Sequence, residues 1–143
     1  MKNKKIAVND EEVSKYEALS SKIDEGISKV GILIRKVEKE INGIDVSLHK
    51  AKNLKDQKQK IIDKYTEILA KLCDDCSKVF KDYYNITNTS EEIKQLEDKC
   101  NEYELQLTEK KNKKTELDAK LDTLTKKLKI VGKKIEDLTL ENT

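Results

Sequence analysis

The chain has 143 residues, of which 41% are charged and only 4% are aromatic, and it contains no Pro and no Trp. So few aromatic residues cannot fill a wide globular core, whereas this composition suits long helices that bury a narrow apolar seam. The 30 basic and 28 acidic residues give a formal net charge of +2. Because the two signs are interspersed, we expect neither nucleic acid nor a membrane surface as a partner.

The first residues are basic and precede a helix-start signal. Asn9 and Glu12 have the spacing of an N-cap and the third residue of a helix, so we predict a flexible tail over 1–9 and a helix from residue 10. The tail lacks the apolar segment of a secretory signal, and no apolar run is long enough to span a bilayer. With three Cys, an odd number, this favours a reducing, cytoplasmic location.

A continuous heptad pattern predicts one long helix over 10–84. Apolar residues recur at alternating steps of three and four from Val13 to Tyr83, which is the spacing of a helix that packs lengthwise against another helix. The charged exceptions on this seam are Lys55 and Lys58.

The apolar pattern stops after Tyr84, and residues 85–90 are rich in Asn, Thr and Ser, which compete with helical hydrogen bonds. We therefore predict a turn at 85–90. Thr89 and Glu92 have the spacing of a capping box. They are expected to start a second helix over 91–141, whose heptad seam is equally regular.

Folding the chain back at Ile86 gives an all-α fold, a two-helix antiparallel coiled-coil hairpin with a longer first helix, in a single domain. In this register Lys58 lies opposite Lys114, so the polar interruptions of the two seams coincide. Nearer the turn, Leu72 lies opposite Cys100. The alternative is a parallel dimer of long, nearly straight helices.

The first turns of helix one extend past the end of helix two in this register. Apolar surface left in water is unfavourable by about 25 cal/mol per Å². We therefore expect this overhang to bind a second copy or a different subunit, so that the protein oligomerises. Its apolar residues are Val13, Tyr16, Ile23, Ile27 and Val30.

Apolar residues also gather near the predicted turn. A second stripe beside the seam favours contact with a third or fourth helix. It consists of Leu54, Ile61, Ile68, Cys73 and Phe80. A second group lies at the turn itself and either closes the end of the hairpin or forms a docking patch for a protein. This group consists of Phe80, Tyr83, Tyr84 and Ile86.

Cys73 and Cys76 form a C-x-x-C, and the predicted register places Cys100 beside them. Three thiols in one layer are a candidate zinc site, and two are a candidate disulfide. Structural zinc sites usually have four Cys or His ligands, and the single His, His49, is far away. We therefore interpret Cys76 and Cys100, which stand at a positions, as small hydrophobic residues and predict no metal and no other cofactor.

The sequence contains no motif that carries chemistry. A Ser-His-Asp set, a Gly-rich phosphate loop and an H-E-x-x-H motif are all missing, so we expect neither an enzyme nor a small-molecule substrate. The pattern favours a structural or adaptor protein that mediates assembly, by self-association or as a subunit of a larger complex. The alternative is a small client-binding or chaperone-like helical module, for example a helper of a secreted protein.

Overall fold

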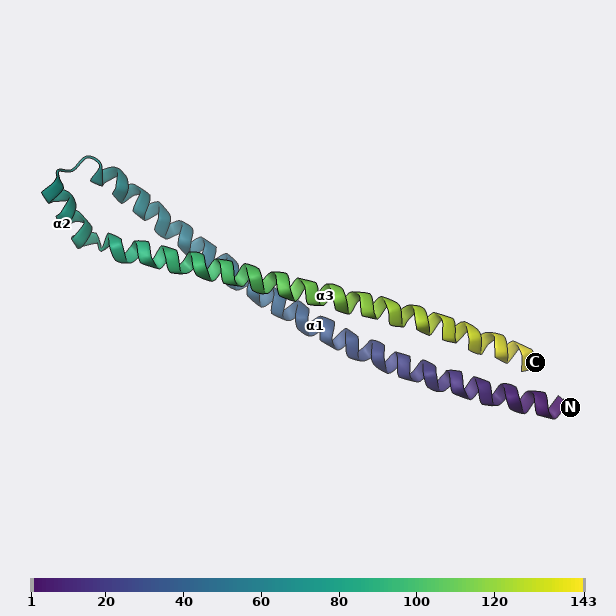
Figure 1. Ribbon diagram of the computed structural model, residues 1–143. Coiled ribbons are helices and arrows are strands. Elements are labelled where there is room, and N and C mark those ends of the chain that lie inside the picture. Colours follow the sequence, from purple (N-terminus) through teal and green to yellow (C-terminus); the bar gives the residue numbers. More distant parts are fainter. Residues whose placement is uncertain (1, 143) are drawn as a thin grey trace. The chain divides into compact units, whose positions relative to one another are not determined.

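The structure is a computed structural model that describes residues 2–142, with side chains described over 10–140. These residues form three helices, α1 (Lys2–Leu69), α2 (Asp74–Tyr84) and α3 (Ile86–Asn142). The 68-residue α1 and the 57-residue α3 run antiparallel, and the 11-residue α2 connects them (Figure 1). The predicted all-α helical hairpin with a longer first helix is therefore confirmed. Among the described residues, no helix is both apolar enough and long enough to cross a membrane.

Contacts divide the chain into two units, and in each of them part of α1 packs against part of α3. The first unit joins α1 up to residue 39 to α3 from residue 112 onward; in it, Gly26 lies against Leu124. The second unit consists of residues 40–111 and includes α2.

The apolar side chains that α1 and α3 bury against each other occupy the predicted heptad seam. In the first unit they are Ile23, Val30, Ile34, Val37, Val131 and Leu138. In the second unit they are Leu48, Ala51, Ile93, Cys100 and Leu107. Each of these residues stands at an a or d position, so the predicted seam is confirmed for both helices.

The helix predicted over 10–84 is wrong at both of its ends. The backbone is helical from Lys2, so the tail predicted over 1–9 is part of α1, except for Met1, which lies outside the described residues. Residues 2–9 contain no Pro or Gly, and nothing in them prevents a long helix from extending to its N-terminus.

At its other end α1 stops at Leu69, and residues 70–73 form a tight turn. The N–H groups of Lys71 and Leu72 bond to carbonyl groups three residues earlier, at 3.1 and 3.2 Å. The sequence analysis missed this turn because the heptad pattern continues through it. The available signal was the pair Asp74 and Asp75, since carboxylates favour the first turn of a helix, where the dipole is positive.

The turn predicted at 85–90 is reduced to the single residue Asn85. It adopts a left-handed conformation, with φ 50° and ψ 48°, which Asn tolerates better than most residues, and α3 begins at the next residue. Thr89 does not cap a helix as predicted, because it lies inside α3, where its hydroxyl group donates to the carbonyl of the preceding Asn85 at 3.3 Å.

The predicted register is also wrong, because Lys58 bonds to Glu92 and Lys114 pairs with Glu38 at 3.5 Å. Lys58 thus meets α3 about three heptads earlier than predicted. A shift by whole heptads still brings a positions against d positions, so the apolar pattern alone does not distinguish the two registers. The charged groups do, because every seam lysine reaches a glutamate of the opposite helix. The pairs are Lys55–Glu97, Lys58–Glu92, Lys110–Glu40 and Lys114–Glu38.

The same shift removes the predicted overhang. In the first unit α3 runs alongside the early turns of α1, and Ile23 and Val30 are buried within the chain. Val13, Tyr16 and Ile27 are half-buried. The expectation that these five residues form an uncovered seam is therefore wrong, because α3 covers it.

Candidate interaction site on α2

Helix α2 is fixed at both ends by local features of the sequence. Cys73 is its N-cap, and the Cys73 sulfur accepts a hydrogen bond from the backbone N–H of Cys76 at 3.5 Å. Asp74 and Asp75 occupy the first turn, and the left-handed Asn85 ends the helix. The 11 residues between these caps have no buried side chain, so the helix depends on its caps and on one contact face.

That contact face is aromatic. The ring of Tyr65 on α1 lies 5.5 Å from the ring of Phe80 and 4.8 Å from that of Tyr84, measured between centroids. Phe80 and Tyr84 lie 4.6 Å apart, so the three rings form one cluster between α1 and α2. Aromatic pairs at such distances add about 0.5–1.5 kcal/mol beyond burial, and this cluster holds α2 against α1.

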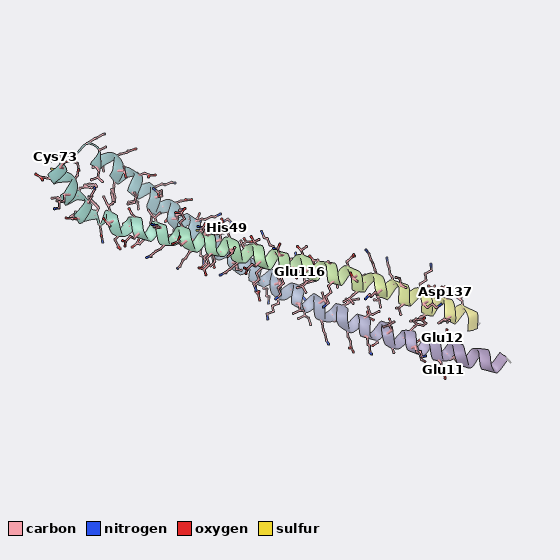
Figure 2. All side chains as sticks on the ribbon, viewed as in Figure 1. Glu11, Glu12, His49, Cys73, Glu116 and Asp137 are labelled. Carbon is pink, nitrogen blue, oxygen red and sulfur yellow. The ribbon has the colours of Figure 1, made fainter. Side chains whose placement is uncertain are left out.

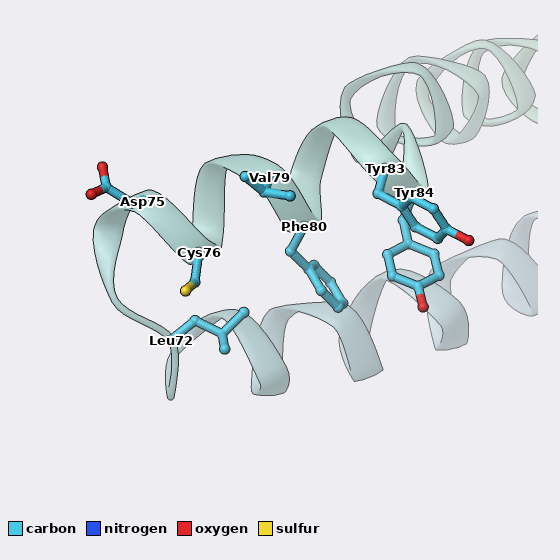
Figure 3. Close-up of a pocket in the computed structure, with 7 residues that line it drawn as sticks. All are labelled: Leu72, Asp75, Cys76, Val79, Phe80, Tyr83 and Tyr84. Carbon is cyan, nitrogen blue, oxygen red and sulfur yellow. The ribbon is translucent and has the colours of Figure 1, made fainter.

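A groove of about 490 Å³ lies next to the cluster, and Phe80 and Tyr84 belong to both. Figure 3 shows Cys76 pointing toward Leu72, with Val79 and Phe80 further along the helix. The lining of the groove is predominantly apolar, with Asp75 near the N-terminal end of α2. The lining residues are Leu72, Asp75, Cys76, Val79, Phe80, Tyr83 and Tyr84.

The groove displays heptad positions that are covered elsewhere in the chain. Cys76, Val79 and Tyr83 continue the a and d pattern of the seam across the turn at 70–73. All three are exposed: Val79 has 68% and Tyr83 has 79% of its surface open to solvent. Helix α2 therefore presents a short apolar stripe of the kind that normally packs against another helix.

The predicted turn group is only partly brought together. Phe80 and Tyr84 join the ring cluster, the ring of Tyr83 meets that of Tyr84 edge-on at 4.9 Å, and Ile86 is half-buried at the start of α3. The sequence analysis did not single out Tyr65, Leu72 or Val79 as part of this site. Their seam positions were the available signal, because an a or d residue must pack against something.

Of the second apolar stripe, only Phe80 packs between α1 and α2, where its ring contacts Tyr65. Cys73 is exposed, and the part of the stripe on α1 is open to solvent, so contact of the stripe with a further helix stays a prediction. Leu54, Ile61 and Ile68 are each 44–45% exposed.

The cysteines do not form the three-thiol layer expected from the predicted register. Cys100 is buried in a cluster with Leu48, Ala51 and Leu107, whereas Cys73 and Cys76 are exposed at the start of α2. Figure 2 labels Cys73 at the turn that precedes α2. In the part of the chain that the structure describes, no group of three or more His, Cys, Asp or Glu residues could hold a metal ion.

The two exposed cysteines are electronically different. The Cys76 thiol and the Cys76 backbone N–H both donate to the Cys73 sulfur, and these hydrogen bonds hold the pKa of Cys73 below its usual value. The same thiol contact raises the pKa of Cys76, because Cys76 is the donor. Cys73 is therefore the better thiolate of the two.

Comparisons with known proteins identify no relative. No protein-family model, no curated protein and no solved structure matches the chain. The function is therefore argued from the α2 site alone.

Proposed function

We propose that this protein is a non-enzymatic, hairpin-shaped interaction protein that assembles with another protein through the α2 groove. The observation that carries the proposal is the exposed seam of α2, where Val79 and Tyr83 stand open at 68% and 79%. Tyr is enriched at the centres of interfaces, because its ring supplies a large contact area at a low cost in side-chain entropy.

The expected occupant is an amphipathic helix. Apart from Leu72 in the turn, the groove is built from α2, whose backbone groups bond within the helix, so it offers no strand edge to an extended peptide. Recognition must then come from side chains filling the groove, as when one helix lays its apolar face on another.

The charges at the edge of the groove determine which residues are favoured beside the apolar stripe of that partner helix. Asp75 lines the groove, and Asp82 lies seven residues later, on the same edge of α2. We therefore propose a partner helix whose apolar stripe is flanked by Lys or Arg. Nucleic acid and anionic membranes are poor occupants, because they would meet the same two carboxylates.

A second copy of α2 fits less well than such a partner. Antiparallel pairing of two α2 helices would bring Asp75 of one copy close to Asp82 of the other, and like charges at these flanking positions are unfavourable. Parallel pairing would set Asp75 against the second copy's Phe80 and offer it no cation.

The adaptor and the client-binding module would both use the α2 groove. They differ in how long the partner stays bound: an adaptor forms a lasting complex, whereas a client-binding module releases its client. A groove at one short helix, with no buried core of its own, favours an adaptor that holds one helical segment of a larger complex. A cytoplasmic location is part of the proposal, because the three cysteines are free thiols, as is usual in a reducing compartment.

Two designed helical peptides test the proposal against the full chain. Both carry the same leucine stripe, flanked by lysines in one peptide and by glutamates in the other. Fluorescence anisotropy should show tighter binding of the lysine-flanked peptide. The double variant Val79→Ser/Tyr83→Ser should weaken that binding by about tenfold or more, as expected when central interface residues are lost.

A matched control keeps the loss specific to the groove. Leu105 is 64% exposed on α3, so Leu105→Ser removes a comparable exposed apolar residue and should leave binding unchanged. Equal binding of the two peptides, or equal loss in both variants, would contradict the proposal. If sedimentation instead shows a dimer that the double variant abolishes, the occupant is a second copy, and a separate partner is wrong.

A further inference from the structure

The C-x-x-C at the start of α2 is built from one cap position and one position a single turn later. Cys73 is the N-cap and Cys76 is the third residue of the helix. A side chain at an N-cap reaches back over the first turn toward the third residue, which is the geometry of a capping box. The two sulfur atoms are thereby held side by side.

The contact between them is direct. The Cys73 sulfur accepts hydrogen bonds from the backbone N–H of Cys76, at 3.5 Å, and from the Cys76 thiol. Backbone angles at Cys73 are φ −68° and ψ 164°, an extended conformation available to any residue, so no strained backbone has to relax for the thiols to meet.

Capping does not explain a cysteine at this position. Sulfur is a weak acceptor, and Ser, Thr, Asp or Asn caps a helix better. Nor does packing within the chain explain it, because both Cys73 and Cys76 are exposed there, whereas Cys100 is the cysteine that acts as a buried hydrophobic residue. An exposed, adjacent pair of thiols at the positive end of a helix is the setting in which cysteines are reactive.

We propose that Cys73 and Cys76 are a redox-active pair that forms a reversible disulfide by exchange with a low-molecular-weight disulfide. This inference does not depend on the proposed docking role. Cys73 is the attacking group, since its thiolate forms more readily, and Cys76 is the resolving group. Asp74 and Asp75 lie between them and oppose a neighbouring thiolate, but the hydrogen bonds to Cys73 act in the other direction.

The exchange proceeds in two balanced steps. The Cys73 thiolate attacks one sulfur of the small disulfide, forms a mixed disulfide and expels one small thiolate. The Cys76 sulfur, after losing its proton, attacks the Cys73 sulfur of that mixed disulfide and expels the second small thiolate. The protein loses two thiol hydrogens, the small disulfide gains them as two thiols, and the two protein sulfurs are joined.

Oxidised glutathione is the probe for the test, applied to the reduced full chain and followed by rapid alkylation. Trypsin cleaves after Lys71 and Lys78, so residues 72–78 form one peptide that carries both cysteines, while Cys100 lies in another. The expected product is a 72–78 peptide lighter by two hydrogens, with Cys100 fully alkylated. Alkylation of the reduced chain should modify Cys73 about fivefold faster than Cys76, in keeping with its larger thiolate fraction.

Single variants separate the two roles. In Cys76→Ser the resolving thiol is lost, so a glutathione mixed disulfide should accumulate on Cys73. In Cys73→Ser the cap is retained or improved, and α2 should remain helical by circular dichroism. Cys76 should then be glutathionylated about threefold more slowly than Cys73 is in Cys76→Ser, a smaller difference than in the wild type because the contact that raises the pKa of Cys76 is lost. A lasting mixed disulfide on wild-type Cys73, faster reaction at Cys76, or oxidation of Cys100 in preference to the pair would overturn the proposal.

Discussion

Within residues 40–111, two pieces of helix carry the same heptad pattern in different surroundings. Leu48 and Leu107 occupy seam positions where α1 meets α3, and both are buried in one cluster with Ala51 and Cys100. Val79 and Tyr83 occupy seam positions on α2, and both are exposed. The difference is that α1 and α3 cover each other at the first pair, whereas no described part of residues 40–111 buries the second.

This contrast separates stability from binding. Burial of the first pair lowers the free energy of the folded chain by roughly 1.5–3 kcal/mol for each large side chain, whereas an exposed side chain adds little. Helix α2 instead relies on its caps and its contact with Tyr65. Its exposed seam contributes to free energy only when another chain covers it.

The largest expected difference in the free energy of unfolding is between truncation of a covered seam residue and truncation of an exposed one. Leu107 is 7% exposed, so Leu107→Ala should lower the free energy of unfolding by about 2–3 kcal/mol, in urea titrations followed by far-ultraviolet circular dichroism. Val79→Ala should change it by less than about 0.5 kcal/mol. A large loss for Val79→Ala would show that Val79 is covered in solution and would break the contrast.

The C-cap of α2 should have an intermediate effect. Asn85 has φ 50°, a region that costs most residues with a Cβ about 1–2 kcal/mol, and Asn less. Asn85→Ala should therefore destabilise the chain by about 1 kcal/mol, whereas Asn85→Gly should be close to neutral because Gly adopts this conformation readily. Urea titration measures both, and equal losses in the two variants would show that the conformation of Asn85 is not what ends α2.

The sequence predicted the helical class, the hairpin and the identity of the seam, because each depends on a period that any window of the chain displays. It did not predict where the chain turns. The heptad runs unbroken through Leu72 and Cys76, so periodicity gave no sign of the turn at 70–73. The turn predicted over the six residues 85–90 consists of Asn85 alone. The interaction residues predicted on α1 are therefore buried or half-buried. Of those predicted at the turn, Tyr83 and Tyr84 are exposed on α2, whereas Phe80 and Ile86 are half-buried.

Register was the other feature that periodicity left undetermined. Shifting α3 by whole heptads keeps apolar layers together, so the choice rests on specific side chains such as Lys58 and Glu92. The sequence analysis aligned the polar interruptions with one another, whereas the structure places each seam lysine beside a glutamate. An ammonium group that reaches a carboxylate is favoured over two ammonium groups in one layer.

Charge reversal across the seam tests that register, because the two registers predict opposite signs for the change in stability caused by Lys58→Glu. With Glu92 as its partner, Lys58→Glu should destabilise the chain, Glu92→Lys should do the same, and the double variant should recover about 0.5 kcal/mol relative to the sum of the single effects. The Lys52–Glu104 pair, at 3.3 Å but about half exposed on both sides, is the control and should couple more weakly. If Lys58 lay opposite Lys114, Lys58→Glu would relieve repulsion and stabilise the fold, so a gain in the urea midpoint would reject the observed register.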